Sequence, residues 1–319
     1  MILTVTLNTA LDITYRVRSL RPHASHRVSD VAERPGGKGV NVARVLAALG
    51  HEVTVTGLVG GVTGDQVRER LAHTPGLTDA LMPVAGTTRR TIAVVDALSG
   101  DTTQLNEPGP QIGPAEWAAF QGFYGELLRS ASAVALSGSL PPGVPVGAYA
   151  GLIRTARAAG VPVLLDTDGE PLRRGVAARP DIIKPNAEEL AELTGAHDPL
   201  RATQDARRRG AHAVVSSLGP AGLLAVTPEG HWRAAPPARI PGNPTGAGDS
   251  VVAGLLSGLV EHLPWPERLT RATALSAATV RAPGAGEFDR ESYEELRGRI
   301  TVTGGTHAVT APERAQPLT

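Results

Sequence analysis

Hydrophobic residues recur along this chain of 319 residues with two different periods. Continuous apolar runs of strand length alternate with segments in which apolar residues return every three or four positions, as on one face of a helix. The predicted strands are 1–7, 52–59, 133–137, 161–166, 181–183 and 213–217, and the predicted helices are 39–49, 65–72, 147–159, 187–193 and 250–263. This alternation predicts an α/β fold of three layers, in which helices cover both faces of a mostly parallel central sheet.

Two segments interrupt the alternation. Residues 13–34 and 88–105 alternate polar and apolar positions, and neither is joined to a helix of matching length. This pattern predicts a small antiparallel sheet, here called the lid, that protrudes from the main layer and shields a bound substrate from water. An extension at the edge of the main sheet is the alternative interpretation.

The C-terminal segment differs from the rest of the chain. Residues 301–319 are rich in Thr, Gly, Pro and Ala and have no apolar period. We therefore expect one domain over residues 1–300, with the two lid segments inserted into it, followed by a disordered tail.

Charge and composition exclude several classes of protein. The 31 basic and 31 acidic residues balance, and no basic block suggests a nucleic-acid partner. The N-terminus lacks the basic lead and cleavage site of a signal peptide, and no apolar run is long enough to cross a membrane. We therefore expect a cytoplasmic protein. The absence of cysteine rules out disulfides, thiolate metal ligands and a cysteine nucleophile.

Only two of the 31 basic residues are lysines, Lys38 and Lys184. A lysine kept in such an arginine-rich chain indicates a position that needs a compact ammonium group rather than a planar guanidinium. Both lysines, like all five asparagines, fall in segments that have other features of a binding site. Chance, together with the preference of asparagine for turns, is the alternative explanation.

The segment 243–250 has the strongest chemical character. Gly246, Ala247 and Gly248 allow backbone N–H groups to approach a ligand closely, and the helix that follows adds the positive end of its dipole. Asp249 lies at the same point. An anion-binding turn beside a carboxylate suits the deprotonation of a hydroxyl group that attacks a bound phosphoryl group. An ordinary glycine-rich helix start is the alternative.

A second glycine-rich turn, at residues 35–43, also opens a helix. Gly37, Lys38 and Asn41 would offer backbone N–H groups, an ammonium group and an amide to a polyhydroxylated, anionic ligand. The spacing is not that of a Walker loop. Asp12 follows the first predicted strand, where it could accept hydrogen bonds from sugar hydroxyls or serve as a turn residue.

Two further segments follow predicted strands. Asn186 and Glu189 are three residues apart in the first turn of a helix, next to Lys184, so they could hold Mg²⁺ through water. A capping box would have the same spacing. Small residues after another strand would let a base or a ribose approach the backbone, although a turn explains them equally well: Ser217, Gly219 and Gly222.

Together these segments resemble the PfkB family of carbohydrate kinases, which has a ribokinase-like fold. The resemblance covers about residues 1–300 and rests on four motifs in family order, at 36–44, 184–189, 217–222 and 245–249. The chain is most similar to the branch that phosphorylates fructose 1-phosphate or tagatose 6-phosphate. The features of that branch are segment 8–12, Lys38, segment 105–110 and segment 137–143.

The resemblance implies a role for each matching residue. Asp249 would be the general base, with Gly246, Ala247 and Gly248 forming the anion-binding turn. The sugar phosphate would be held by Asp12, Arg27, Gly37, Lys38, Asn41, Arg89 and Ser137. The nucleotide side would comprise Lys184, Asn186, Glu189, Ser217, Gly219, Gly222 and Thr245, with Asn186 and Glu189 near Mg²⁺.

Three positions depart from the family pattern. Thr9 replaces the usual proline, Gln104 replaces an acidic residue, and Arg90 follows Arg89, which leaves open which arginine meets the substrate phosphate.

The resemblance implies an ATP- and Mg²⁺-dependent kinase that phosphorylates the 6-hydroxyl of fructose 1-phosphate. Phosphorylation of tagatose 6-phosphate or fructose 6-phosphate at the 1-hydroxyl is the alternative. A non-catalytic sensor of sugar phosphates would need a damaged Asp249 or anion-binding turn, and both are intact. Family relatives also suggest a homodimer that pairs through the lid.

Overall fold

The computed structural model describes residues 1–28 and 30–306. Within them, ten strands form one sheet in the order β14-β13-β12-β11-β10-β9-β8-β1-β4-β5. These strands are β1 (Ile2–Thr6), β4 (Val53–Val59), β5 (Leu77–Pro83), β8 (Ala133–Ser137), β9 (Val163–Asp166), β10 (Ile182–Ile183), β11 (Ala213–Ser217), β12 (Leu223–Val226), β13 (Gly230–Ala235) and β14 (Thr301–Thr306). Strands β5 to β11 in this order are parallel, and the last three join antiparallel.

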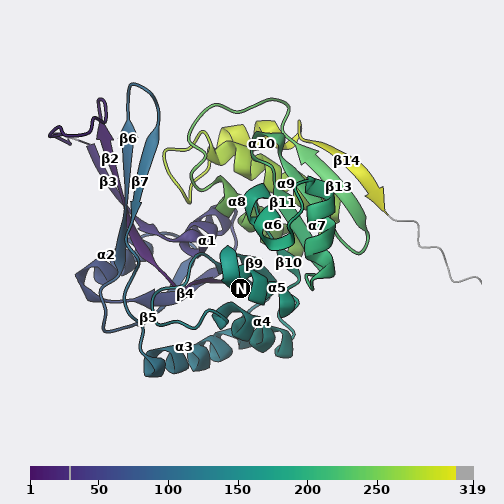
Figure 1. Cartoon of the computed structure of the whole chain (residues 1–319), viewed down its shortest axis with the longest axis horizontal. Helices are drawn as coiled ribbons and strands as arrows, with labels where there is room; N and C mark the ends of the chain where they lie inside the picture. Colours follow the sequence, from purple (N-terminus) through teal and green to yellow (C-terminus); the bar gives the residue numbers. More distant parts are fainter. Residues whose placement is uncertain (29, 307–319) are drawn as a thin grey trace, which may run out of the picture.

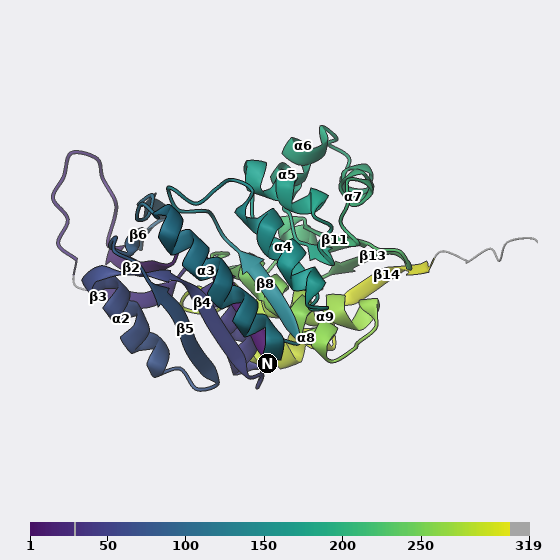
Figure 2. The same cartoon turned by 90° about the horizontal axis from the view of Figure 1, so that it is seen from below.

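Helices cover both faces of this sheet (Figures 1 and 2). One face packs against α1 (Lys38–Ala48), α2 (Gly61–Ala72), α8 (Ala247–Val260), α9 (Trp265–Thr279) and α10 (Arg290–Arg297). The other packs against α3 (Pro114–Leu127), α4 (Ala148–Ala158), α5 (Gly169–Ala177), α6 (Ala187–Thr194) and α7 (Pro199–Arg208). In β8, for example, Ala135 faces the first core and Val134 the second. The predicted three-layer α/β fold is confirmed.

The lid is a separate four-stranded sheet that stands apart from the main layer (Figure 1). Its strands are β2 (Ala10–Val17), β3 (Asp30–Gly36), β6 (Arg89–Asp96) and β7 (Thr102–Asn106), in the order β3-β2-β6-β7. Each predicted segment supplies an antiparallel pair, but β2 and β6 meet in parallel. The expectation of a wholly antiparallel lid is wrong because both segments leave the main sheet in the same direction, after parallel strands.

The predicted tail begins too early. Residues 301–306 form β14, which pairs antiparallel with β13 and extends the main sheet. Alternating threonines suit an edge strand, since β-branched side chains fit a pleated, half-exposed surface. The rest of that prediction, residues 307–319, lies outside the described residues. None of the helices within 1–28 and 30–306 is long and apolar enough to cross a membrane.

The parallel strands end on one side of the sheet, and this gathers residues far apart in sequence. Asp166 ends β9, Lys184 follows β10 and Ser217 ends β11. In open α/β sheets, ligands bind beyond these carboxyl ends. The start of α8 lies at the same place, and because α8 begins at Ala247 rather than at the predicted residue 250, Asp249 is in its first turn.

Candidate active site

A cleft of about 730 Å³ lies beyond the strand ends and beneath the lid. Most of the residues singled out from the sequence line it, although they come from both sheets and three helices. They are Asp12, Gly37, Lys38, Asn41, Arg89, Lys184, Asn186, Glu189, Ser217, Thr245, Gly246, Gly248 and Asp249. The structure therefore brings the predicted sugar side, nucleotide side and acid–base residue into one cavity.

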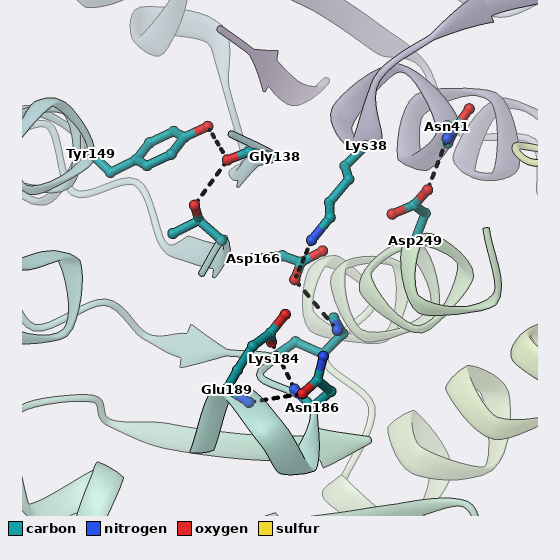
Figure 3. A network of polar contacts seen from close by, with 10 residues as sticks. Lys38, Asn41, Gly138, Tyr149, Asp166, Lys184, Asn186, Glu189 and Asp249 are labelled. Carbon is teal, nitrogen blue, oxygen red and sulfur yellow. Dashed lines mark hydrogen bonds and ion pairs between the residues drawn. The ribbon is translucent and has the colours of Figure 1, made fainter. Parts of the chain in front are cut away.

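Asp249 is buried in the first turn of α8, with 6% of its surface exposed. Asn41 in α1 donates a hydrogen bond from Nδ2 to Asp249 Oδ2 at 2.9 Å (Figure 3). Burial, and then the nearby negative charge of Asp166, raise the pKa of Asp249 to about 7, against the lowering effects of Asn41, Lys38 and Lys184. A carboxyl group poised near neutral pH can accept a proton from a substrate hydroxyl.

The turn before Asp249 requires glycine. Gly246 has a φ of 84°, in the left-handed region, and a Cβ there would lie 2.7 Å from the Cα of Ala285. The Ala247 N–H donates to the Pro244 carbonyl at 3.0 Å, and Gly246 and Gly248 on either side of it line the cleft. A helix start that faces a cleft in this way has the geometry that favours an anionic group.

Asp166 is a buried carboxylate that joins the two lysines of the chain. Its side chain is 1% exposed, and Lys184 Nζ and Lys38 Nζ lie 3.4 Å and 3.7 Å from its Oδ1 (Figure 3). Burial would lower the pKa of the Lys38 ammonium, but Asp166 and, to a lesser degree, Asp249 and other carboxylates outweigh it and raise the pKa. Two ammonium groups therefore share one buried carboxylate at this point of the cleft.

The sequence analysis did not identify Asp166 as a site residue. Asp166 ends the predicted strand 161–166, but a single acidic residue at the end of a buried strand has no motif spacing that marks it as functional. The two lysines were the available clue, because a buried ammonium needs a nearby carboxylate.

Asn186 and Glu189 form the capping box that the sequence left as an alternative. The Glu189 N–H donates to Asn186 Oδ1 at 2.9 Å, and the Asn186 N–H donates to Glu189 Oε2 at 2.8 Å. Burial is the largest influence on the pKa of Glu189 and raises it, opposed by the Asn186 N–H and by the lysines. The capping box uses one carboxylate oxygen of Glu189, and both side chains still line the cleft.

On the lid side of the cleft, Asp12 accepts a hydrogen bond from Thr91 Oγ1 of the neighbouring strand. Burial raises the pKa of Asp12, and Thr91 and Arg89 oppose this rise. A half-buried carboxylate in a wall of the cleft is suited to accept hydrogen bonds from hydroxyl groups of a ligand.

The structure distinguishes the two neighbouring arginines. Arg89 lines the cleft, where its Nε donates to the Asn8 carbonyl at 3.1 Å and its Nη1 to the Glu107 carbonyl at 3.2 Å. Arg90 lies on the outer surface and forms an ion pair with the Glu107 carboxylate at 2.8 Å. Arg89 is therefore the arginine that can meet a ligand in the cleft.

Two residues proposed for the sugar side do not line the cleft. Arg27 is exposed in the loop between β2 and β3, which extends away from the main sheet (Figure 2). Ser137 is fully buried at the end of β8, while the next residues, Gly138 and Ser139, line the cleft in its place. A strand-end serine points into the core when the strand alternation places it on that face.

A second cavity of about 590 Å³ adjoins the cleft. The two cavities share Asn186, Ser217 and Gly248. Small and apolar residues line much of the second cavity, including Gly219, Gly222, Leu223, Ile240, Ala247, Val251, Ala277 and Val280. A charged cleft joined to an apolar slot suits a ligand with both phosphates and a flat base.

Comparison with known proteins gives one consistent result. The model of the pfkB family of carbohydrate kinases matches residues 5–291. A 1-phosphofructokinase from Xanthomonas campestris pv. campestris is 39% identical over 310 residues, covering 94% of this chain and 97% of that protein. A solved structure of a possible 1-phosphofructokinase from Thermotoga maritima has 29% identity and a TM-score of 0.87, covering 95% of this chain and 99% of that one.

Phosphofructokinase-2 from Escherichia coli is also similar. Its tetrameric inhibited form and its complex with fructose-6-phosphate have TM-scores of 0.86 and 0.85. Each is 29% identical, and each match covers 93% of this chain and 98% of that chain.

Proposed function

Because this chain belongs to the pfkB family of carbohydrate kinases, we propose that it transfers the γ-phosphoryl group of ATP to the 6-hydroxyl of fructose 1-phosphate. The observation that carries the proposal is the buried Asp249 carboxylate beside the glycine turn of α8, in one cavity with both lysines. The 1-phosphofructokinase that is 39% identical supports the choice of acceptor. ATP and sugar phosphates are cytoplasmic metabolites, so the proposal includes a cytoplasmic location.

In the proposed reaction, Asp249 accepts the proton of the 6-hydroxyl as that oxygen attacks the γ-phosphorus. The new O–P bond forms in line with the breaking bond to the β-phosphate, and ADP leaves. The N–H groups at the start of α8 would stabilise the negative charge on the transferred group. Lys38 and Lys184, which Asp166 holds in the cleft, would balance the charge of the phosphates.

The proposal assigns the two cavities to the two substrates. The sugar phosphate would occupy the lid side of the cleft, where Asp12 and Asn41 meet its hydroxyls and Arg89 its phosphate. Gly37 and Lys38 would close this side from the start of α1. The base of ATP would occupy the second cavity, near Gly219 and Gly222, with Ser217 and Thr245 nearer the phosphates. These assignments rest on which residues line each cavity and on the charges that those residues carry.

The donor set fits a hydrated Mg²⁺. Both oxygens of Asp166 are buried, and neither has a hydrogen-bond partner within residues 1–28 and 30–306. Glu189 lies nearby and has one oxygen outside the capping box, next to Asn186. No group of three or more potential ligands occurs in the same ranges, so the ion would also depend on ATP phosphates and water. When bound, Mg²⁺ would neutralise phosphate charge.

The acceptor is tested by a panel of three sugar phosphates. Purified protein with Mg-ATP is expected to have the highest kcat/KM with fructose 1-phosphate, measured by coupled ADP release. Higher kcat/KM with fructose 6-phosphate or tagatose 6-phosphate would overturn this choice. The fructose-6-phosphate complex of the similar E. coli phosphofructokinase-2 favours testing that acceptor first among the alternatives. Binding of Mg-ATP without turnover on any acceptor would instead indicate a sensor.

The kcat/KM for the acceptor is expected to rise with pH through about 7. Asp249 has a pKa raised to about 7, and only its ionised form, which predominates above that pH, can accept the hydroxyl proton. Initial rates at low acceptor concentration measure this midpoint. The substrate phosphate also titrates, near pH ~6. In Asn41→Leu the midpoint should move upward, because Asn41 lowers the pKa of Asp249; an unmoved midpoint would assign the titration to the substrate.

The proposal includes a homodimer that pairs through the lid. Four of the six exposed large hydrophobic residues of the described chain lie in or beside the lid: Leu20, Val31, Leu98 and Leu105. Val31 is 51% exposed on edge strand β3. We expect light scattering to show a dimer for the unaltered protein and a monomer for Val31→Asp. Val62→Asp, at a 74% exposed position of α2, is the control; equal behaviour of the two variants would contradict the lid interface.

A further inference from the structure

One carboxylate, Glu287, connects the lid to the rest of the site. Its Oε1 accepts a hydrogen bond from Arg34 Nε of β3 at 3.2 Å and another from Arg44 Nη2 of α1 at 2.7 Å. Arg44 is 14% exposed and Arg34 is 27% exposed. Charge-assisted hydrogen bonds at this depth are stronger than those of exposed ion pairs. Loss of this single oxygen would therefore remove an ion pair from β3 and another from α1 at once.

The loop that carries Glu287, residues 280–289 between α9 and α10, also supports the anion-binding turn. Arg44 Nη1 donates to the Ala285 carbonyl at 3.0 Å. On its other side, Ala285 lies against Gly246, where a Cβ would come within 2.7 Å of the Ala285 Cα. Arg34 approaches the same loop at Gly284, where a Cβ would be 2.7 Å from Arg34 Nη1. The two arginines thus hold the loop that holds Gly246.

The arginines lie on elements that also carry residues of the cleft. In α1, Asn41 is one turn before Arg44 and donates to the Asp249 carboxylate. In the lid, β3 ends at Gly36, just before the sugar-side residue Lys38. A cavity of about 320 Å³ separates the lid from the loop, and Arg34 lines it together with Gly284 and Ala285. The ion pair between Arg34 and Glu287 joins the lid to the loop beside this cavity.

From these contacts we infer that Glu287 is a positioning residue that couples the seating of lid strand β3 to the geometry of the turn at Gly246–Asp249. The inference rests on the proposed kinase function. While Glu287 holds Arg34 and Arg44, strand β3 is seated against the loop 280–289, and the same loop keeps the turn at Gly246 in place. Without the Glu287 carboxylate, Arg34 and Arg44 repel each other, the loop keeps only the hydrogen bond from Arg44 to the Ala285 carbonyl, and the N–H donors of the turn shift relative to the transferred phosphoryl group.

The main test is Glu287→Ala, which removes both ion pairs. If the variant misplaces the turn slightly, kcat should fall far more than binding weakens. We expect kcat to fall on the order of tenfold to hundredfold, with the KM values of ATP and the sugar phosphate changing less than about threefold. ATP hydrolysis without acceptor should rise as a fraction of phosphoryl transfer, since an unseated lid admits water. Glu287→Gln, which keeps one acceptor oxygen, should recover part of kcat.

The matched control is Glu295→Ala. Glu295 forms an exposed ion pair with Arg299, 50% and 57% exposed, at the C-terminal end of α10 and beyond. This variant should retain the kcat and the hydrolysis fraction of the unaltered protein. If Glu287→Ala also retains both, or if its loss of activity only follows a smaller folded fraction in thermal unfolding, the inference is overturned.

Arg34→Ala keeps the inference testable should Glu287→Ala fold poorly, because it removes the lid end of the same contact from an edge strand and should lower kcat in the same way. Where both variants fold, a double-mutant cycle tests the coupling between the two residues. If Glu287 acts through Arg34, the double variant should lose no more kcat than the more damaging single variant. Independent, multiplicative losses would overturn the coupling. An unaltered protein that phosphorylates no sugar phosphate refutes the proposed function, whereas an active protein with an insensitive Glu287 refutes only this inference.

Discussion

Asp249→Asn is expected to reduce kcat on the order of 10²–10⁴-fold, the contribution usual for a positioned general base. Asparagine keeps the size of the side chain and can still accept a hydrogen bond from Asn41, but it cannot accept the hydroxyl proton. The KM of the sugar phosphate should therefore change little. Steady-state kinetics of the purified variant, compared with a direct measurement of sugar-phosphate binding, separates these two effects.

The same variant should gain conformational stability at alkaline pH. The pKa of Asp249 is raised from 3.8 to about 7 in the folded protein, so ionisation of this buried group destabilises the fold as pH rises through that interval. The neutral amide removes this cost, which is fully present above about pH 7. Thermal unfolding at pH 8 measures the difference. Asp205→Asn, at an exposed ion pair in α7, is the control for both measurements.

A variant that kept the normal kcat would remove Asp249 from the chemistry. If the variant were less stable than the unaltered protein at pH 8, the ionised Asp249 carboxylate would be stabilising the fold, contrary to its raised pKa. Low activity combined with unchanged or increased stability is the pattern that the structure predicts.

Gly246→Ala is expected to reduce kcat on the order of 10²–10³-fold, as the loss of an oxyanion-type donor does in other enzymes. The left-handed φ of 84° disfavours alanine, and the added Cβ would collide with the Ala285 backbone. The turn must shift, and its N–H groups then miss the transferred phosphoryl group. Binding of ATP should weaken less than kcat falls, since the second cavity is unchanged.

Gly195→Ala separates backbone strain from the collision. Gly195 ends α6 with a φ of 79°, and a Cβ there meets no atom within 4 Å. It therefore carries a similar conformational cost, about 1 kcal/mol, without displacing a neighbour. Equal kcat losses in the two variants would show that strain alone matters. A normal kcat in Gly246→Ala would remove the turn from the mechanism.

Much of the site follows from the sequence because parallel strands place their carboxyl ends on one side. Lys184 follows one predicted strand and Ser217 ends another, and the structure brings them into one cleft with Asp249. The helix period located the core of α8, but not its start, since Ala247 and Gly248 have too little apolar character to extend the pattern. Local periodicity fixes elements well and their ends poorly.

Other features depend on contacts that no local pattern encodes. Asp166 owes its importance to two lysines that arrive from α1 and from the end of β10. The pairing of β14 with β13 joins residues about seventy positions apart, and the segment by itself has the composition of a tail. Arg27 illustrates the converse, because a basic residue in the right segment of the sequence is held outside the cleft by a loop that points away.

The convergence of Lys38 and Lys184 on one carboxylate has a practical consequence for labelling. Apart from the α-amino group, these are the only primary amines in the chain. Lys38 is 37% exposed and Lys184 is 6% exposed. An amine-selective reagent can therefore modify the side chains of this protein only within its cleft, and phosphates bound as we propose would cover both targets. The rate at which Lys38 is acylated would therefore report how much of the cleft is occupied by ligand, without an engineered probe.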